Sequence, residues 1–144
     1  MNRKLLITGW LLIAICFTLK AQIISDEQRV RDALTAQVVA WNGGNIHAFM
    51  QSYAKTDSIM FIGSKSVTYG WDSTLAHYKK SYPNKAAMGV LSFDLIKVKQ
   101  LSPDYFFVVG KFTLIRDRDT PSGHFDLLFQ KINSQWFIVS DHTS

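Results

Sequence analysis

Residues 125–142 read Phe-Asp-Leu-Leu-Phe-Gln-Lys-Ile-Asn-Ser-Gln-Trp-Phe-Ile-Val-Ser-Asp-His, and this stretch decides how the rest of the chain can fold. Two runs rich in β-branched and aromatic residues flank the polar pair Asn133-Ser134, so the stretch predicts a β-hairpin with a two-residue turn. A symmetric turn places Phe125 opposite His142, and opposed side chains share one face of a sheet. We therefore expect His142 on the apolar face and Asp141 on the other, whereas a three-residue turn would exchange them.

Two long strands are predicted before this hairpin. Residues 87–99 change the phase of their apolar alternation, which indicates a β-bulge near Leu95 that bends the sheet. Residues 105–116 alternate regularly, with apolar side chains in both phases. If the loop that follows is symmetric, Arg116 lies on the same face as His142, close to one end of the sheet.

Three helices and one short strand are predicted nearer the N-terminus. The capping box at residues 25–28 begins a helix that should run to about Trp41, where Gly43-Gly44 follows. A second, short helix should begin at the cap Asn45, and the remaining elements are a strand over residues 58–63 and a helix over residues 72–82. The order predicts an α+β domain in which three helices pack on one face of a strongly bent antiparallel sheet.

Both faces of the last strand are apolar, with Trp136 and Ile138 on one and Phe137 and Val139 on the other. Helices that precede the long strands can cover one face only. A sheet face in contact with water should be polar, so we expect a second copy of the chain to cover the other face, as a homodimer.

The first 21 residues have the layout of a secretory signal peptide, and residues 22–144 form the single remaining domain. A basic start precedes the apolar run of residues 5–19, and Ala21 is a small residue suited to cleavage. We expect a periplasmic or secreted protein that is free of the membrane after cleavage. An uncleaved anchor helix is the alternative, although the run is shorter than the roughly 20 residues that a bilayer span needs.

Composition excludes several classes of function. Without residues 1–21, 13 of the 16 basic residues remain against 11 acidic ones, and no basic stripe with interleaved aromatics indicates nucleic acid. Cys16 is the only cysteine, so the mature domain has no disulfide and no thiol nucleophile. No Gly-x-Ser-x-Gly elbow is present, and we expect neither a metal nor a cofactor.

The chain resembles the nuclear transport factor 2-like superfamily, and within it the SnoaL-like group that contains domain of unknown function 4440. The resemblance spans about residues 25–144 and rests on four stretches, Ala40-Trp-Asn-Gly-Gly-Asn-Ile46, Tyr69-Gly-Trp-Asp72, Gly123-His-Phe-Asp-Leu-Leu-Phe129 and Trp136-Phe-Ile-Val-Ser-Asp-His-Thr-Ser144. It implies a cone-shaped fold, as in ketosteroid isomerases and the association domain of calcium/calmodulin-dependent kinases. It also implies a pocket between helices and sheet, and a dimer through the outer face of the sheet.

Members of this superfamily differ in function, so the residues of the pocket must decide it. In the isomerases a carboxylate base stands on the first short strand, and the corresponding position here is Phe61. Asp94 should point away from the pocket by its alternation with its neighbours. With no inward carboxylate expected, the sequence argues against a proton-abstracting isomerase.

His142 is the expected general base, because imidazole titrates near neutral pH, with Arg116 steering an anionic or carbonyl group. His142 could instead be a structural histidine bonded to a backbone carbonyl. An acidic cluster of His124, Asp126 and Asp141 is expected on the outer face, without the third firm ligand that a metal needs. The expected ligand-binding residues are aromatic, and they could equally be core: Trp41, Tyr53, Phe61, Trp71 and Tyr78.

Two classes of function stay open. The first is an exported pocket protein for a small hydrophobic or carbonyl-containing molecule, with a lyase, isomerase or cyclase activity as one form of it. The second is a non-catalytic dimerisation or assembly module of the cell envelope. The sequence does not decide whether the protein is an enzyme.

Overall fold

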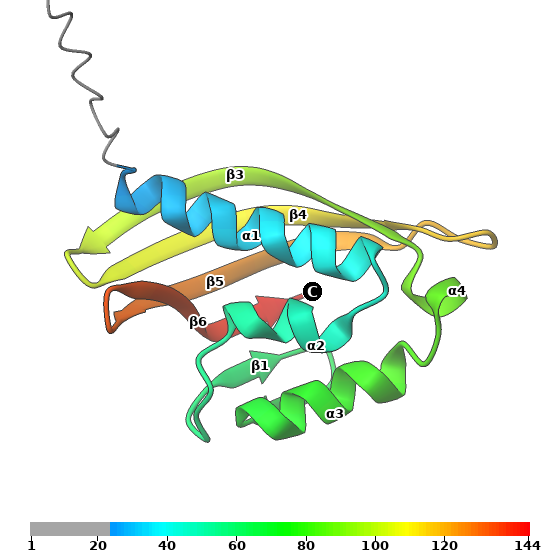
Figure 1. The fold of residues 1–144 in the computed structure, drawn as a ribbon. Coiled ribbons are helices and arrows are strands. Elements are labelled where there is room, and N and C mark those ends of the chain that lie inside the picture. The colour runs from blue at the N-terminus through cyan, green and yellow to red at the C-terminus, as the bar shows by residue number, and fades with distance from the viewer. Residues whose placement is uncertain (1–23) are drawn as a thin grey trace, which may run out of the picture.

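The computed structural model describes residues 24–144, and the predicted signal peptide lies outside them (Figure 1). Helices and short strands come first, and four long strands follow. The elements are α1 (Asp26–Asn42), α2 (Ile46–Phe49), a 3-10 turn η1 (Met50–Ser52), β1 (Met60–Ile62), β2 (Val67–Tyr69), α3 (Trp71–Ser81), α4 (Lys85–Met88), β3 (Val90–Ser102), β4 (Tyr105–Ile115), β5 (Ser122–Ile132) and β6 (Gln135–Thr143). Within residues 24–144, no helix is long and apolar enough to span a membrane.

The six strands form one curved sheet in the order β2-β1-β6-β5-β4-β3, with helices on its concave side (Figure 1). The predicted α+β architecture is confirmed. One pairing differs from the antiparallel sheet expected, because β1 runs parallel to β6, with Met60 beside Ser140. β2 and the single-turn helix α4 were not predicted, since three or four residues carry too little periodicity to be recognised.

Local signals place the helix ends. Ser25 caps α1 by accepting a hydrogen bond from the Gln28 amide at 3.1 Å, and Gly44 follows its end with φ = 75°, a conformation that favours glycine. Asn45 caps α2 through the Ala48 amide at 2.9 Å. The third helix begins at Trp71, and its cap position is Gly70, two residues before the predicted cap Asp72.

The predicted bulge in the long third strand is confirmed. Leu95 pairs with Gly110 and Lys97 with Val109, so Ile96 is the extra residue, and more than half of its surface is exposed. The bulge moves the apolar phase of β3 from Leu95 to Val98 and bends the sheet around the helices.

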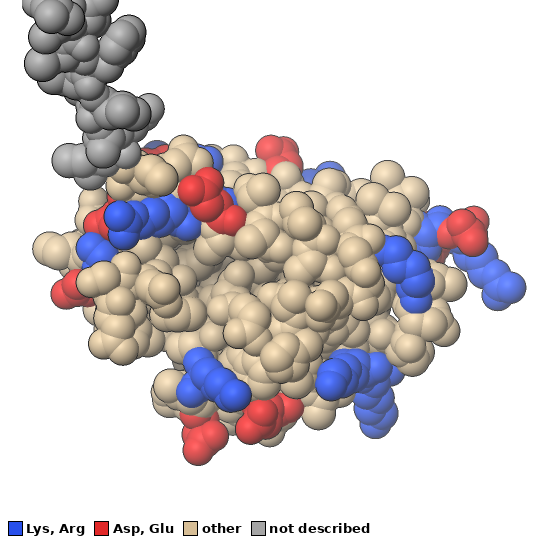
Figure 2. Space-filling model, in the orientation of Figure 1, with Lys and Arg blue, Asp and Glu red and all other residues tan. Residues whose placement is uncertain are grey.

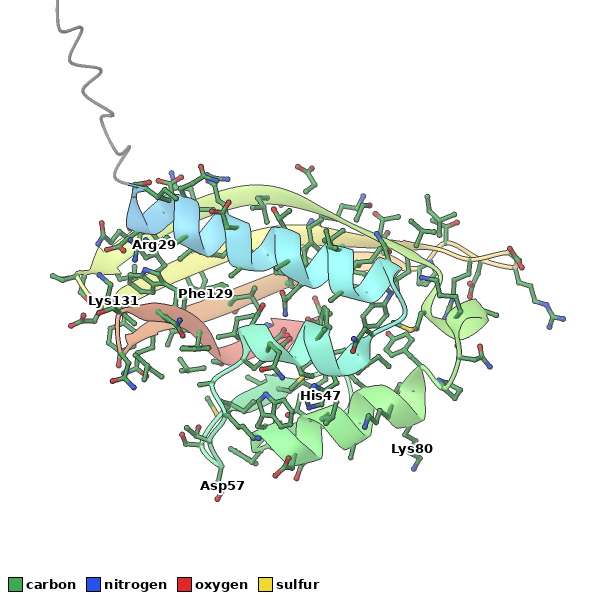
Figure 3. The ribbon with its side chains drawn as sticks, viewed as in Figure 1. Arg29, His47, Asp57, Lys80, Phe129 and Lys131 are labelled. Carbon is green, nitrogen blue, oxygen red and sulfur yellow. The ribbon has the colours of Figure 1, made fainter. Side chains whose placement is uncertain are left out.

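The core fills the space between the helices and the concave face of the sheet. Phe129 of β5 is fully buried and lies on the side that faces α1 (Figure 3). Side chains from α1 and from the inner phase of β4–β6 surround it, namely Val30, Leu34, Phe106, Val108, Leu127 and Ile138. A cavity lies at the end of this core that is nearest to α3.

Candidate functional site

The cavity has a volume of about 130 Å³ and lies between α1, α3 and the inner face of β3–β6. Its wall is mainly aromatic and aliphatic, and the larger part comes from Trp41, Phe49, Tyr53, Phe61, Tyr78, Tyr82, Phe93, Phe112, Leu114, Phe125 and Leu127. Its polar groups are Gln37, His77, Ser81, Asp141 and Thr143. A cavity of about 150 Å³ with apolar walls holds benzene, so this one fits a molecule of one ring.

Four of the five predicted ligand-binding residues line this cavity, namely Trp41, Tyr53, Phe61 and Tyr78. Their role in binding stays a prediction. Trp71 does not line the cavity. Its indole N–H donates to the Met50 carbonyl at 2.9 Å, and this bond fixes the start of α3 against η1.

Tyr78 stands at the centre of the aromatic wall. Its ring centroid lies 5.2 Å from that of Phe49, 5.3 Å from that of Phe61 and 6.1 Å from that of Trp41. Most of these pairs meet edge to face or tilted, the arrangements that aromatic rings favour. Interlocked rings leave little freedom for collapse, which keeps the cavity open.

Asp141 is the carboxylate of the cavity, contrary to the placement expected from the hairpin. The two-residue turn is confirmed, with φ of 49° at Asn133 and 64° at Ser134. Phe129 pairs with Ile138, but Leu128 pairs with Ser140, so Val139 is an extra residue in β6. This bulge reverses the phase of the strand and turns Asp141 inward.

The expected position of His142 is therefore wrong. Its partner across the strands is Asp126 rather than Phe125, and its ring is exposed on the outer face. Its Nδ1 lies 2.9 Å from Asp126 Oδ1 at the surface. The predicted outer cluster loses Asp141 for the same reason, and within residues 24–144 no group of three ligating side chains could hold a metal ion.

Arg116 also lies away from the cavity. The loop after β4 is tighter than predicted, because the Arg116 amide donates to the Asp119 carbonyl at 3.0 Å and Phe112 pairs with Gly123. The guanidinium binds Asp119 through two hydrogen bonds of 2.6 Å on the hairpin that projects beyond the sheet (Figure 1). It is thus not placed to steer a carbonyl group in the cavity.

Two hydroxyls hold the Asp141 carboxylate, which is 3% exposed. Tyr53 donates to Oδ2 at 2.5 Å, and Thr143 donates to Oδ1 at 2.8 Å. The Tyr78 hydroxyl lies 3.4 Å from that of Tyr53 and extends the chain of polar groups. Tyr53 is fixed in this position because the next amide, at Ala54, donates to the Ile138 carbonyl of β6 at 2.9 Å.

Burial raises the pKa of Asp141 to about 6, although the hydrogen bonds from Tyr53 and Thr143 lower it. The negative charge of Asp126 raises it further. Burial also raises the pKa of Tyr53 and of Tyr78 well above the ordinary value, and the Asp141 charge adds to both shifts. Near neutral pH the site thus combines a carboxylate that can accept a proton with two neutral phenols that can donate hydrogen bonds.

No Lys or Arg lines the cavity among residues 24–144, so Asp141 has no cation beside it there. Charged side chains are also unevenly distributed on the surface. On the face shown in Figure 2 they lie along the margins, and the middle is nearly free of them. His77 also lines the cavity, and its ring packs on Phe61 with the centroids 5.4 Å apart.

The sequence reasoning missed Asp141 because a bulge within the run of apolar residues 136–139 leaves no break in alternation. Tyr82 and His77 were missed for another reason. His77 lies on α3 and Tyr82 directly follows the end of that helix, and the polar residues 79–81 between them are typical of a solvent-facing surface.

Comparison with known proteins decides the family. No protein-family model matches the sequence, and no curated protein matches it. A solved structure from Shewanella oneidensis, a nuclear transport factor 2-like protein of unknown function, is 42% identical, over 81% of this chain and 96% of that one, with a TM-score of 0.78. The chain belongs to the nuclear transport factor 2-like family.

More distant structures share the nuclear transport factor 2-like fold. A ketosteroid isomerase-like protein from Erwinia carotovora is 18% identical, over 80% of this chain and 92% of that one, with a TM-score of 0.63. A calcium/calmodulin-dependent protein kinase type II association domain from Thiobacillus denitrificans is 16% identical, over 79% and 92%, with a TM-score of 0.68. At these identities the likeness extends to the fold alone.

Proposed function

We propose that the protein is an exported small-molecule-binding protein that holds a hydrophobic molecule of about one ring in the cavity and exchanges a proton with it at Asp141. The observation that carries this proposal is a carboxylate, 3% exposed and the single one in the lining among residues 24–144, in a cavity with aromatic walls. Concave apolar sites with a few convergent polar groups and a perturbed pKa are typical of ligand and active sites.

The reaction class that this site supports is proton transfer, as in isomerases and lyases. A carboxyl group whose pKa is about 6 can accept a proton near neutral pH and release it again. The argument from sequence against proton abstraction assumed that no carboxylate faced inward, and Asp141 removes that assumption. The carbonyl-containing substrate expected from sequence rested on Arg116, which binds Asp119 instead.

Native protein isolated from the outer compartments of the cell tests the proposal by mass spectrometry. We expect a chain that begins near Gln22, because residues 1–21 have the layout of a signal peptide, and a bound small molecule that denaturation releases. The cavity-filling variant Leu127→Phe should lose this molecule, whereas Leu128→Phe, on the opposite face of the same strand, should keep it. A start at Met1 would contradict cleavage of a signal peptide, and equal ligand content in both variants would contradict the site.

A second function, a dimerisation or assembly module of the cell envelope, is supported by the outer face of the sheet. Phe107 and Leu128 pair there, Phe137 lies on the same face, and all three are only half-buried within one chain. Ile96 and Ile115 are more than half exposed. A face of this kind fits an identical partner, because a two-fold axis sets each patch against its own copy.

Light scattering on residues 22–144 should give twice the chain mass. Phe137→Asp should shift the mass to that of one chain, because it places a charge in the apolar face. Val39→Asp is the matched control, since Val39 is 67% exposed on α1, away from this face. A single-chain mass for the unsubstituted protein at micromolar concentration would show that the outer face stays exposed to solvent and would contradict the dimer.

A further inference from the structure

Asp141 is a buried carboxylate, and His142 at the outer surface is the only positively charged group that acts on its pKa among residues 24–144. Hydroxyl groups solvate it, but the lining holds no Lys or Arg among residues 24–144. A carboxylate taken out of water without a counter-charge is unfavourable, and the bound molecule can supply that charge. A negatively charged ligand in the same cavity would instead be repelled by the Asp141 carboxylate.

Aromatic rings close the cavity around this charge. Trp41, Phe61 and Tyr78 all line it, and the Trp41 and Tyr82 centroids lie only 4.7 Å apart. The faces of such rings carry partial negative charge and attract cations. Rings and carboxylate thus favour the same sign of ligand charge.

We propose that the cavity binds an organic ammonium ion, that is, a protonated amine attached to a small hydrophobic group. This inference rests on the proposed function, because it names the ligand of the same cavity. The ammonium N–H groups donate to Asp141 and to the Tyr78 hydroxyl oxygen, and the hydrocarbon part packs on Leu127 and Phe125. A neutral carbonyl compound could accept hydrogen bonds from the lining but would leave the carboxylate without a counter-charge.

Four side chains influence the charge of Asp141, namely Tyr53 after η1, Asp126 on β5, and His142 and Thr143 on β6. Tyr78 and His77 of α3 line the same cavity. Both tyrosines stay neutral over the working range of pH. A positive charge on His77 would repel an ammonium ion. A test by pH must therefore separate the effect of His77 from the effect of Asp141.

The test is a titration with three probes of one ring, toluene, benzyl alcohol and benzylamine, monitored by NMR. At about pH 7.5 benzylamine should bind about tenfold more tightly than benzyl alcohol, because only the amine is a cation. Its affinity should fall about tenfold between about pH 7.5 and pH 5, as Asp141 takes up a proton. The affinity of benzyl alcohol should change little.

Two variants identify the groups responsible. Asp141→Asn should remove the preference for benzylamine, and His77→Gln should keep both the preference and its loss in acid. If benzyl alcohol binds as tightly as benzylamine to the unsubstituted protein, the ammonium inference is wrong while the pocket function stands. If toluene and both polar probes fail to bind, the proposed function itself fails.

Discussion

Asp141→Asn should make the protein more stable at about pH 7.5, by about 3 kcal/mol at most, while it removes proton transfer at the cavity. Burial favours the protonated, neutral form of this side chain, and its pKa rises from 3.8 to about 6. Asparagine has nearly the shape of the protonated acid and can still accept the Tyr53 hydrogen bond. Since one pKa unit corresponds to about 1.4 kcal/mol, two units give the expected gain.

The pH dependence has a definite sign. Because the pKa is raised on folding, the native state holds the proton more tightly than the unfolded state between about pH 4 and pH 6. The stability that this proton supplies is fully present below about pH 4 and is lost as the pH rises through about 6. The difference between Asp141→Asn and the unsubstituted protein should therefore be largest near neutral pH and vanish in acid.

Urea denaturation at a series of pH values measures this difference. Asp94→Asn is the matched control, because Asp94 is an exposed carboxylate on β3 that does not influence Asp141, and it should change the free energy of unfolding little. A loss of stability in Asp141→Asn at neutral pH would mean that the charged form is favoured in the cavity. Asp141 would then be a structural group whose hydrogen bonds outweigh its burial.

Deletion of Val139 should turn His142 into the cavity and Asp141 out of it. Val139 is the extra residue of the β6 bulge, and without it the strand returns to regular alternation. Either end of the strand could shift to close the gap. If the residues between the turn and the deletion changed face, Trp136 and Ile138, which are 5% and 0% exposed, would become exposed. If residues 140–144 changed face instead, only these five residues would move.

Below about pH 4, where Asp141 is neutral in the folded protein, this deletion should cost about 1–3 kcal/mol, because the buried Tyr53 hydroxyl loses its partner. The decrease in stability between about pH 4 and pH 6 that Asp141 causes should also disappear. Val139→Ala is the control, since it shortens the side chain, retains the bulge and should keep that pH dependence. If the deletion variant titrates as the unsubstituted protein does, the turn side has shifted instead.

Much of the fold was predictable because its signals are local. The Ser25 cap, the glycines after Trp41 and the left-handed pair Asn133-Ser134 each act within a few residues. The bulge at Ile96 was predictable as well, because Asp94 and Lys97 flank the apolar pair Leu95-Ile96 and reveal the change of phase. The same physical feature in β6 left no trace, since Val139 follows three other apolar residues.

The candidate site was only partly predictable, because it depends on these registers. Trp41 and Tyr78 could be assigned to the cavity from helical spacing, which does not depend on pairing. His142 and Arg116 were placed by assuming symmetric connections, and both placements failed. One extra residue in β6 and a tighter turn at Asp117-Arg118 account for the two errors.

The place of β6 in the sheet has a consequence for how the molecule is assembled in time. β6 is the last strand of the chain but a central strand of the sheet, and it joins β1 to β5 (Figure 1). β1 can therefore pair with β6 only when the chain has been made as far as Ser140, the partner of Met60. Contacts between such distant residues form slowly because the loop between them must first close. A chain without β6 lacks the carboxylate and also the strand that unites the two parts of its sheet, so the cavity can form only after β6 is present.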